Sequence, residues 1–231
     1  MPVRIFRDRR DAGKQLAVKV AEVADPSPLP HALIVLGLPR GGVPVAYEVA
    51  TLLGIPLDVL PVRKLGLPGF EEYAVGAIAA VNGEPVVFIE ENARPSEIEA
   101  QRQLDDVVRR QWSELLRRRR AYRGTRPALQ LEDHDVILVD DGLATGATML
   151  AAVRAVRRAG ARRIITAVPV VASDAYALIA READVCCHVV RTENLHAVGM
   201  WYEDFSPTSD LEVVALLAEA ERRRAHRLPS R

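Results

Sequence analysis

The chain has 231 residues, of which 49% are apolar, enough to bury the core of one α/β domain with an appendage or of two small domains. Basic and acidic residues number 31 each, so no net field recruits nucleic acid or a membrane surface. No apolar stretch approaches the roughly 20 residues of a membrane span, and the first residues lack the apolar segment of a secretory signal. The two cysteines are adjacent, which favours reduced core thiols over a strained disulfide, and we expect a cytoplasmic protein.

The first part of the chain alternates helix and strand signals. Residues 8–24 are predicted to form a helix, because apolar residues recur along one face and the segment "DPSPLP" ends it. Residues 32–36 form a predicted strand, which runs into the loop "GLPRGG" and then into a helix with an apolar face. In this loop Arg40 adds a fixed charge, while Gly41 and Gly42 allow a close approach of the backbone to a ligand. By itself the loop fits an anion site and a plain tight turn equally well.

The next predicted strand, residues 57–62, delivers Arg63 and Lys64 into the loop "KLGLPGFEEYAVG". This loop has two glycines, a proline and few apolar anchors. We therefore expect residues 64–73 to be mobile without a ligand and to close over the site when a ligand binds. The other interpretation of Arg63 and Lys64 is a solvated end of the strand.

A hairpin and a long helix are predicted next. Two apolar runs, residues 75–80 and 85–89, flank an Asn-Gly pair that is a strong signal for a tight turn. A long inserted helix is predicted over residues 94–122, because it opens with a capping box and ends with arginines where the helix dipole is negative. Its apolar stripe is narrow, so we expect it to pack on the core by one edge or against a second subunit. The arginines at 117–120 fit a solvated helix end better than a nucleic-acid site, since no aromatic residues are interleaved.

The segment "DVILVDDGLATGATMLAAVRAVRRAG", residues 135–160, places polar residues between a strand and a helix. Residues 136–139 read as a buried parallel strand, and apolar spacing from Met149 predicts a helix that Gly160 ends. The polar residues therefore follow the carboxyl end of a strand, where open α/β sheets bind ligands and where the next helix directs free N–H groups. An anion is the expected ligand.

Within this segment, residues 145–148 suit a phosphate, because small residues let backbone N–H groups surround it and two hydroxyls add donors. Asp140 and Asp141 would repel a phosphate unless they face another part of the ligand, such as sugar hydroxyls or a bound Mg²⁺. The segment lacks the lysine of a P-loop and the glycine spacing of a dinucleotide fingerprint. It predicts a ligand that carries a phosphate and a polyol, with a metal ion; the alternative is an ordinary capped helix beside a surface acidic pair.

The last third of the chain completes the predicted sheet. Two further strands and an intervening helix, within residues 163–190, extend it to a doubly wound, mainly parallel sheet. Trp201, Tyr202 and Phe205 then gather in a chain that is only 5% aromatic, before a final helix. Packing in the core and stacking on a flat ligand are equally consistent with these rings.

Residues 136–148 resemble the signature of type I phosphoribosyltransferases, which is four apolar residues, two acidic residues and a small loop ending T-G-x-T. Residues 38–41 lie where that family holds pyrophosphate. The run "VRKLGLPG" is partly similar to the "RK…LPG" run of the adenine-using members, which is too little to indicate adenine. The resemblance extends over residues 32–217 and implies one α/β domain over residues 1–231.

The resemblance also implies a reaction. Ribose 5-phosphate would be transferred from phosphoribosyl pyrophosphate (PRPP) to a nitrogenous base, a purine or a pyrimidine, with release of pyrophosphate. Mg²⁺ would be the cofactor, bridging pyrophosphate and sugar without an assigned protein ligand. A small hood, formed by residues 191–210 with part of the N-terminal region, would hold the base. Tyr202 and Phe205 are the candidate base contacts, because residues three apart share a face in a helical turn, with Trp201 turned away.

The family's other roles fall on residues already singled out. The 5-phosphate would bind to Ala144, Thr145, Gly146, Ala147 and Thr148, and the pyrophosphate to Arg40, Gly41, Arg63 and Lys64. The candidate catalytic residues are Asp140, Asp141 and Lys64. The two carboxylates would bind the ribose hydroxyls and favour the positive charge that develops on the sugar, while the cations stabilise the departing pyrophosphate.

Two other hypotheses keep the ligand and change the function. One is a non-catalytic regulator that senses PRPP and binds nucleic acid through the arginines at 117–120 or the tail "ERRRAHR", against which the neutral charge balance argues. The other is a sugar-phosphate enzyme of different chemistry on the same loop, which the acidic pair disfavours. Turnover of a panel of bases separates the three.

Overall fold

The computed structural model describes most of the chain. Described are residues 5–24, 33–67, 70–81, 84–89, 98–124, 126 and 129–227, with the backbone alone at residues 64, 67, 70–75, 98–100 and 227. The predicted Asn-Gly turn at residues 82 and 83 and the start of the predicted capping box at Ser96 lie outside the described residues.

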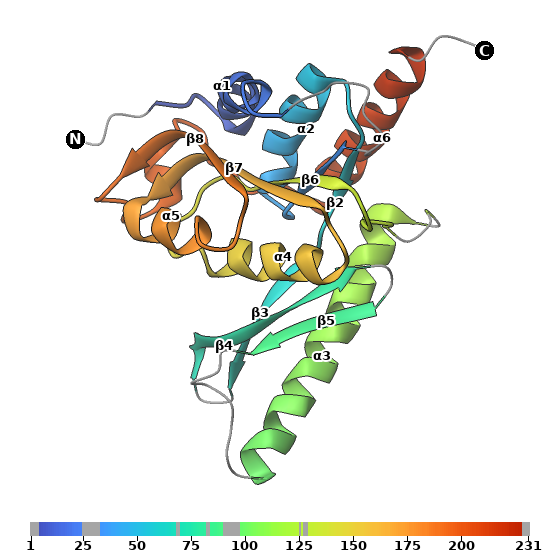
Figure 1. Ribbon diagram of the computed structural model, residues 1–231, viewed down its shortest axis with the longest axis vertical. Coiled ribbons are helices and arrows are strands. Elements are labelled where there is room, and N and C mark those ends of the chain that lie inside the picture. The colour runs from blue at the N-terminus through green and yellow to red at the C-terminus, as the bar shows by residue number, and fades with distance from the viewer. Residues whose placement is uncertain are drawn as a thin grey trace.

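Five parallel strands form the central sheet, in the order β2-β1-β6-β7-β8 (Figure 1). They are β1 (Leu33–Gly37), β2 (Leu57–Val59), β6 (Asp135–Val139), β7 (Arg163–Ala172) and β8 (Val185–Thr192). Their apolar, largely β-branched sequences suit strands that are buried on both faces. Because β1 pairs with β6 and Gly37 lies opposite Val139, the loops that follow these two strands leave the sheet side by side.

Helices cover both faces of this sheet, as Figure 1 shows. One face carries α1 (Arg9–Ala21), α2 (Gly42–Leu53) and α6 (Asp210–Arg227), and the other carries α4 (Ala147–Arg158) and α5 (Ser173–Ile179). The prediction of a doubly wound, mainly parallel α/β sheet is therefore confirmed. Among the described helices, none combines the length and the apolar character needed to cross a membrane.

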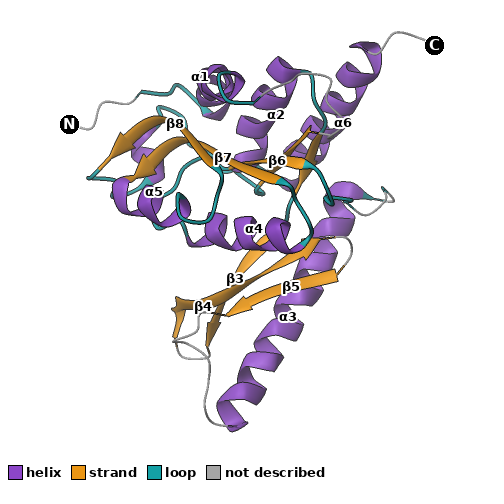
Figure 2. Ribbon diagram, viewed as in Figure 1, coloured by secondary structure: helices purple, strands orange, loops and turns teal. Residues whose placement is uncertain are grey.

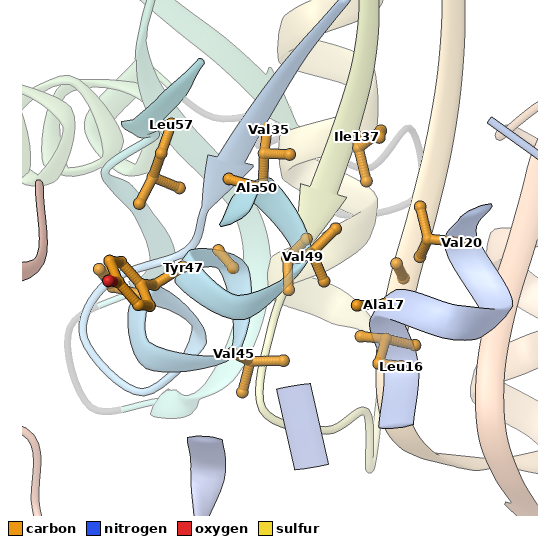
Figure 3. Close-up of a cluster of buried hydrophobic side chains, with 14 of the residues drawn as sticks. Leu16, Ala17, Val20, Val35, Val45, Tyr47, Val49, Ala50, Leu57 and Ile137 are labelled. Carbon is orange, nitrogen blue, oxygen red and sulfur yellow. The ribbon is translucent and has the colours of Figure 1, made fainter. Parts of the chain in front are cut away.

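Side chains alternate between the two faces of the sheet and build two cores. Val35 and Ile137 pack with Tyr47 in the core under α1 and α2, which Figure 3 shows. Leu36 and Leu138, their neighbours in sequence, belong to the core under α4 and α5. Each such fully buried side chain contributes about 1.5–3 kcal/mol relative to an exposed one. The loops at the ends of β1 and β6 are therefore held by a well-packed frame.

A second sheet and a long helix extend beyond α4 (Figure 2). The antiparallel strands β3 (Val62–Leu67), β4 (Phe70–Val81) and β5 (Glu84–Ile89) pair in that order, and α3 (Ile98–Arg123) packs against them. β4 and β5 pair with Val81 opposite Glu84, which agrees with the predicted hairpin. A small separate core joins the helix to the sheet; its buried members are Leu65, Ile78, Leu104, Val107 and Leu115.

The strand predicted over residues 57–62 and the loop predicted after it are both wrong in part. β2 ends at Val59, and the chain enters β3 of the second sheet at Val62. Most of the predicted loop consists of strand residues, up to Leu67 and again from Phe70. Leu65 is completely buried against the small core, so this segment has an apolar anchor that its local sequence did not indicate. The reason is that the partners of Leu65 on α3 lie far along the chain.

Candidate active site

The candidate site lies where β1 and β6 end. The Leu38 N–H donates to the Val139 carbonyl at 2.8 Å, which ties the loop after β1 to the end of β6. The loop then places Gly41 next to the acidic pair, and the peptide bond between Pro39 and Arg40 in this loop is cis. The register of the two strands thus brings together two loops that are about 100 residues apart in the chain.

The acidic pair packs directly against the two glycines at the start of α2. A Cβ atom on Gly41 would lie 1.9 Å from Asp141 Oδ2, and one on Gly42 would lie 2.6 Å from the Val139 carbonyl oxygen. No side chain fits in either place unless its neighbours move. Gly41 has ordinary helical dihedral angles, so glycine is required here by close approach of the carboxylate and not by backbone conformation.

The two carboxyl groups differ in their surroundings. Burial, followed by the charge of Asp141, raises the pKa of Asp140 well above its usual value. Burial also raises the pKa of Asp141, but there the charge and the hydrogen bond of Arg9 act in the opposite direction. One Asp140 oxygen accepts the Asp141 N–H at 2.9 Å, and its other oxygen has no hydrogen-bond partner among the described side chains. Asp140 is therefore a partly buried carboxyl with one oxygen left for a cationic or hydroxyl-bearing ligand.

Arg9 belongs to this site, although the sequence analysis did not select it. Its Nε donates to Asp141 Oδ2 at 2.8 Å, and the side chains of the two residues are only 11% and 17% exposed. The sequence does hold a signal, because Arg9 starts a helix, where the dipole disfavours a cation unless an acidic partner compensates it. That signal names no partner, since Asp141 follows Arg9 by more than half the length of the chain.

The loop after the acidic pair has the geometry of an anion cradle. Backbone hydrogen bonds join Leu143 to β7, and the next two residues, Ala144 and Thr145, are exposed. Gly146 is the N-cap of α4 in the left-handed conformation, with φ 76°, and no side chain caps the helix. The first N–H groups of a helix lack partners within the helix, so those of α4 are free to bind an anion here. The predicted Thr145–Thr148 loop is thus built as a helix N-terminus.

The predicted pyrophosphate residues are not all at the two loops. Arg40 is there and exposed, with its guanidinium 4.0 Å from Asp210. Arg63 lies on β3, and its ion-pair partner among the described residues is Glu114 on α3, at 3.7 Å. The side chain of Lys64 lies outside the described part of the structure.

The predicted role of Tyr202 as a base-stacking residue is wrong for the ring as it is placed. Tyr202 is 1% exposed, its ring packs between Phe6 and Phe205, and its hydroxyl donates to the Asp141 carbonyl at 2.6 Å. Its ring faces are covered, so it cannot stack on a base. Its hydroxyl instead holds the backbone of the acidic pair through the Asp141 carbonyl. Phe205 is partly exposed, but the Arg9 guanidinium covers its ring at 3.8 Å, and its contact with a base stays a prediction.

The region predicted as a hood joins two ends of the chain. Phe6 forms a parallel bridge to Tyr202, and the Glu203 N–H donates back to the Phe6 carbonyl at 2.8 Å. The helix expected at the aromatic cluster is a short 3-10 turn, η2 (Val198–Trp201), which ends before Tyr202. Tyr202 and Phe205 therefore touch, with ring centroids 4.9 Å apart, through packing and not through helical spacing.

A metal ion bound by protein alone has no evident place in this site. Among the described residues, no group of three or more His, Cys, Asp or Glu side chains could hold one. The carboxylates of Asp140 and Asp141 do fit a divalent cation that arrives with phosphate oxygens, which is how Mg²⁺ is commonly bound. A metal would therefore come as part of the substrate complex.

Comparison with known proteins places the chain in a family. The model of the phosphoribosyl transferase domain matches residues 12–200. The chain belongs to the type I phosphoribosyltransferase family. Two proteins of Mycobacterium tuberculosis, from strains CDC 1551 and H37Rv, are each named "Putative phosphoribosyl transferase" and are 43% identical to this family member over 222 residues. That alignment covers 95% of the chain but only 48% of each relative, so the chain spans about half their length.

The crystal structure of TT1426 from Thermus thermophilus is also similar to this chain. The two are 42% identical with a TM-score of 0.79, and the match covers 93% of this chain and 98% of the other. The resemblance inferred from residues 136–148 is thus confirmed at the level of family and fold.

Proposed function

We propose that the protein transfers ribose 5-phosphate from PRPP to a nitrogenous base and releases pyrophosphate. One observation carries the proposal: the acidic pair, the uncapped N-terminus of α4 and the Arg40 loop converge at the ends of β6 and β1. Together they offer donors for a phosphate, acceptors for a polyol and a cation for a second phosphate group. PRPP combines these three features in one molecule.

In this proposal the 5-phosphate binds to residues 144–148. The N–H groups of the first turn of α4 and the hydroxyls of Thr145 and Thr148 supply the donors, and the helix dipole adds a favourable field. Gly146 takes the left-handed conformation at the N-cap, and no side chain competes for these N–H groups. No lysine is needed, because the phosphate is held mainly by the backbone.

Asp140 and Asp141 accept hydrogen bonds from the two ribose hydroxyls. When the bond from the sugar to pyrophosphate breaks, positive charge develops on the ribose ring, and two fixed carboxylates beside it stabilise that charge. The raised pKa of Asp140 means that the protein's own groups compensate its charge poorly. A cation or a developing positive charge there is therefore favoured.

Arg40 and Gly41 bind the departing pyrophosphate, with Arg63 and Lys64 brought in from β3. Mg²⁺ supplies charge neutralisation between pyrophosphate and ribose when it is bound with the substrate. Arg63 would exchange its ion pair with Glu114, at 3.7 Å, for the phosphate. An exposed ion pair of this kind is worth about 1 kcal/mol or less, so the exchange costs little.

The competing regulator hypothesis gains no support from Arg117 and Arg118, two of its proposed nucleic-acid contacts. Arg117 and Arg118 both donate to the Glu114 carboxylate, at 2.7 and 2.9 Å. Their hydrogen bonds lower the pKa of Glu114 to about 2, so that carboxylate stays charged and keeps both arginines engaged. This arrangement is typical of a solvated helix surface.

Turnover of a base panel tests the proposed reaction. PRPP, Mg²⁺ and each of the common purines and pyrimidines are incubated with the protein, and released pyrophosphate is measured. We expect release that depends on one class of base and is lost in the Asp140→Asn, Asp141→Asn double variant. Bound PRPP with no release for any nitrogenous acceptor would favour the regulator instead.

A further inference from the structure

Arg9 contacts the acidic pair, but the proposed function assigns it no role. It enters from α1, on the opposite side of the acidic pair from the α4 loop, and it makes three contacts there. Its Nε donates to Asp141, one terminal nitrogen donates to the Ser206 carbonyl at 2.7 Å, and its guanidinium plane covers the Phe205 ring at 3.8 Å. A guanidinium held by three partners has one position, so the carboxylate oxygen that it binds is fixed as well.

The charges around Asp141 explain why such a partner is needed. The groups that act on it are Asp140 beside it, Arg9 from α1, and the Tyr202 hydroxyl, which donates to its carbonyl. Arg9 is the only cation among these described groups. Two adjacent carboxylates in a site for phosphates repel each other and the ligand, and one buried arginine offsets one of the two charges.

Arg9 also borders the region predicted as the hood. With Asp204, Ser206 and Thr208 it lines a cavity of about 300 Å³. On the other side, Gly41 leaves room for the carboxylate, since a Cβ atom there would lie 1.9 Å from Asp141 Oδ2 and 3.1 Å from the Arg9 Nε. Asp141 Oδ2 is thereby engaged by Arg9, and Oδ1 is the oxygen left without a hydrogen bond among the described residues.

We propose that Arg9 is a positioning residue that fixes Asp141 through its Oδ2 atom, so that Oδ1 faces the ribose of PRPP. This inference rests on the proposed function and deepens it, because it assigns the substrate side of Asp141 to a single oxygen. Arg9 touches no substrate in this scheme and acts only through Asp141.

A double-mutant cycle tests this inference, with the affinity for PRPP and Mg²⁺ measured by calorimetry. Arg9→Gln is made in the wild-type chain and in the Asp141→Asn chain. We expect it to weaken binding about 10-fold in the first background and less than about 2-fold in the second, because the carboxylate it positions is then absent. Arg9→Lys keeps a charge and should recover part of the loss. Thermal midpoints verify that each variant is folded, and if Arg9→Gln does not fold, the cycle is run with Arg9→Lys.

Arg10→Gln is the matched control. Arg10 also sits in the first turn of α1 and pairs with a carboxylate, Glu48, at 2.6 Å, but its described contacts, with Glu48 and the Tyr47 ring, do not include the acidic pair. Its loss should leave PRPP binding unchanged. Equal losses for Arg9→Gln in both backgrounds, or no loss in either, would overturn the inference while the proposed function stands. A wild-type chain that does not bind PRPP would overturn both.

Discussion

Asp140 and Asp141 are adjacent in sequence, but their environments give them different effects on stability. Asp140 has a raised pKa, which means that folding disfavours its charged form. Asp141 is held by Arg9, so its charge has a partner at 2.8 Å. The poorly compensated carboxylate of Asp140 lowers the stability of the folded protein, and we expect ligand binding to be the function that retains it.

Asp140→Asn should therefore stabilise the protein at neutral pH. The amide has the same shape without the charge, and we expect a thermal midpoint about 2–4 °C higher at pH 7, the change that about 1 kcal/mol produces in a chain of this size. Because the folded pKa of Asp140 lies above the unfolded value, the penalty is absent below the unfolded value and grows as pH rises through the folded one. The difference in thermal midpoint between the variant and the wild type should thus disappear as pH falls toward about 4. A gap that widens on acidification would show that the assigned cause is wrong.

Gly41→Ala should damage the site through contact alone. The new Cβ atom would overlap Asp141 Oδ2, which Arg9 holds in place. We expect the affinity for PRPP to fall about 10-fold or more, with a fold that is retained. Gly124→Ala is the control, since a Cβ atom there meets nothing within 4 Å although φ is 52°. It should cost about 1 kcal/mol of stability and leave binding intact; wild-type affinity in Gly41→Ala would refute the role given to this contact.

Much of the site could be predicted from the sequence, because its chemistry is local. The acidic pair, the small loop and the following helix are contiguous, and their order alone indicates an anion site. Arg9 and the support from Tyr202 could not be predicted, since both reach Asp141 from distant segments. Aromatic side chains look alike in sequence whether they stack on a ligand or fill a core.

At the scale of elements, the helices and strands of the central sheet were predictable, and so was the β4–β5 hairpin of the second sheet, but β3 was not. The apolar runs of β1, β6, β7 and β8 are buried on both faces, so their patterns do not depend on a particular partner. β3 carries two charges and a glycine and becomes a strand only because β4 and α3 cover it. Tertiary packing therefore decides its conformation.

Hydrogen exchange across β3 and β4 tests closure over the ligand. The anchor at Leu65 predicts that residues 62–65 exchange slowly with and without PRPP, because they belong to the small core. Residues 66–73, which follow the register shifts at Leu65 and Gly66, should gain protection when PRPP and Mg²⁺ bind. Equal exchange in the two states over residues 66–73 would exclude closure of this segment.

On the scale of the whole molecule, a buried ion pair joins the second sheet and its helix to the central sheet. Arg123 at the end of α3 donates three hydrogen bonds to Asp58 of β2, at 2.9, 3.1 and 3.0 Å. Tyr122, the preceding residue, donates to Asp210 of α6 at 2.7 Å, and burial with this hydrogen bond raises the pKa of Tyr122 to about 12. Two neighbouring residues thus fix the end of α3 to strand β2 of the central sheet and to helix α6, which covers that sheet.

Asp58→Asn should destabilise the whole protein. Removing the carboxylate from a buried pair typically costs about 3–5 kcal/mol, which we expect as a lower midpoint in chemical denaturation. Glu221→Gln is the control, because its pair with Arg126 is exposed and should contribute less than about 1 kcal/mol. Similar midpoints for the two variants would mean that Asp58 and Arg123 do not hold the two parts together.

The central claim is that the acidic pair and the α4 loop form one PRPP site, and calorimetric titration with PRPP and Mg²⁺ tests it most directly. The wild-type chain should bind saturably. The Asp140→Asn, Asp141→Asn double variant, shown to be folded by its thermal transition, should bind at least about 10-fold more weakly, because both ribose acceptors lose their charge. No binding by the wild-type chain at millimolar PRPP, or undiminished binding by the double variant, would contradict the account.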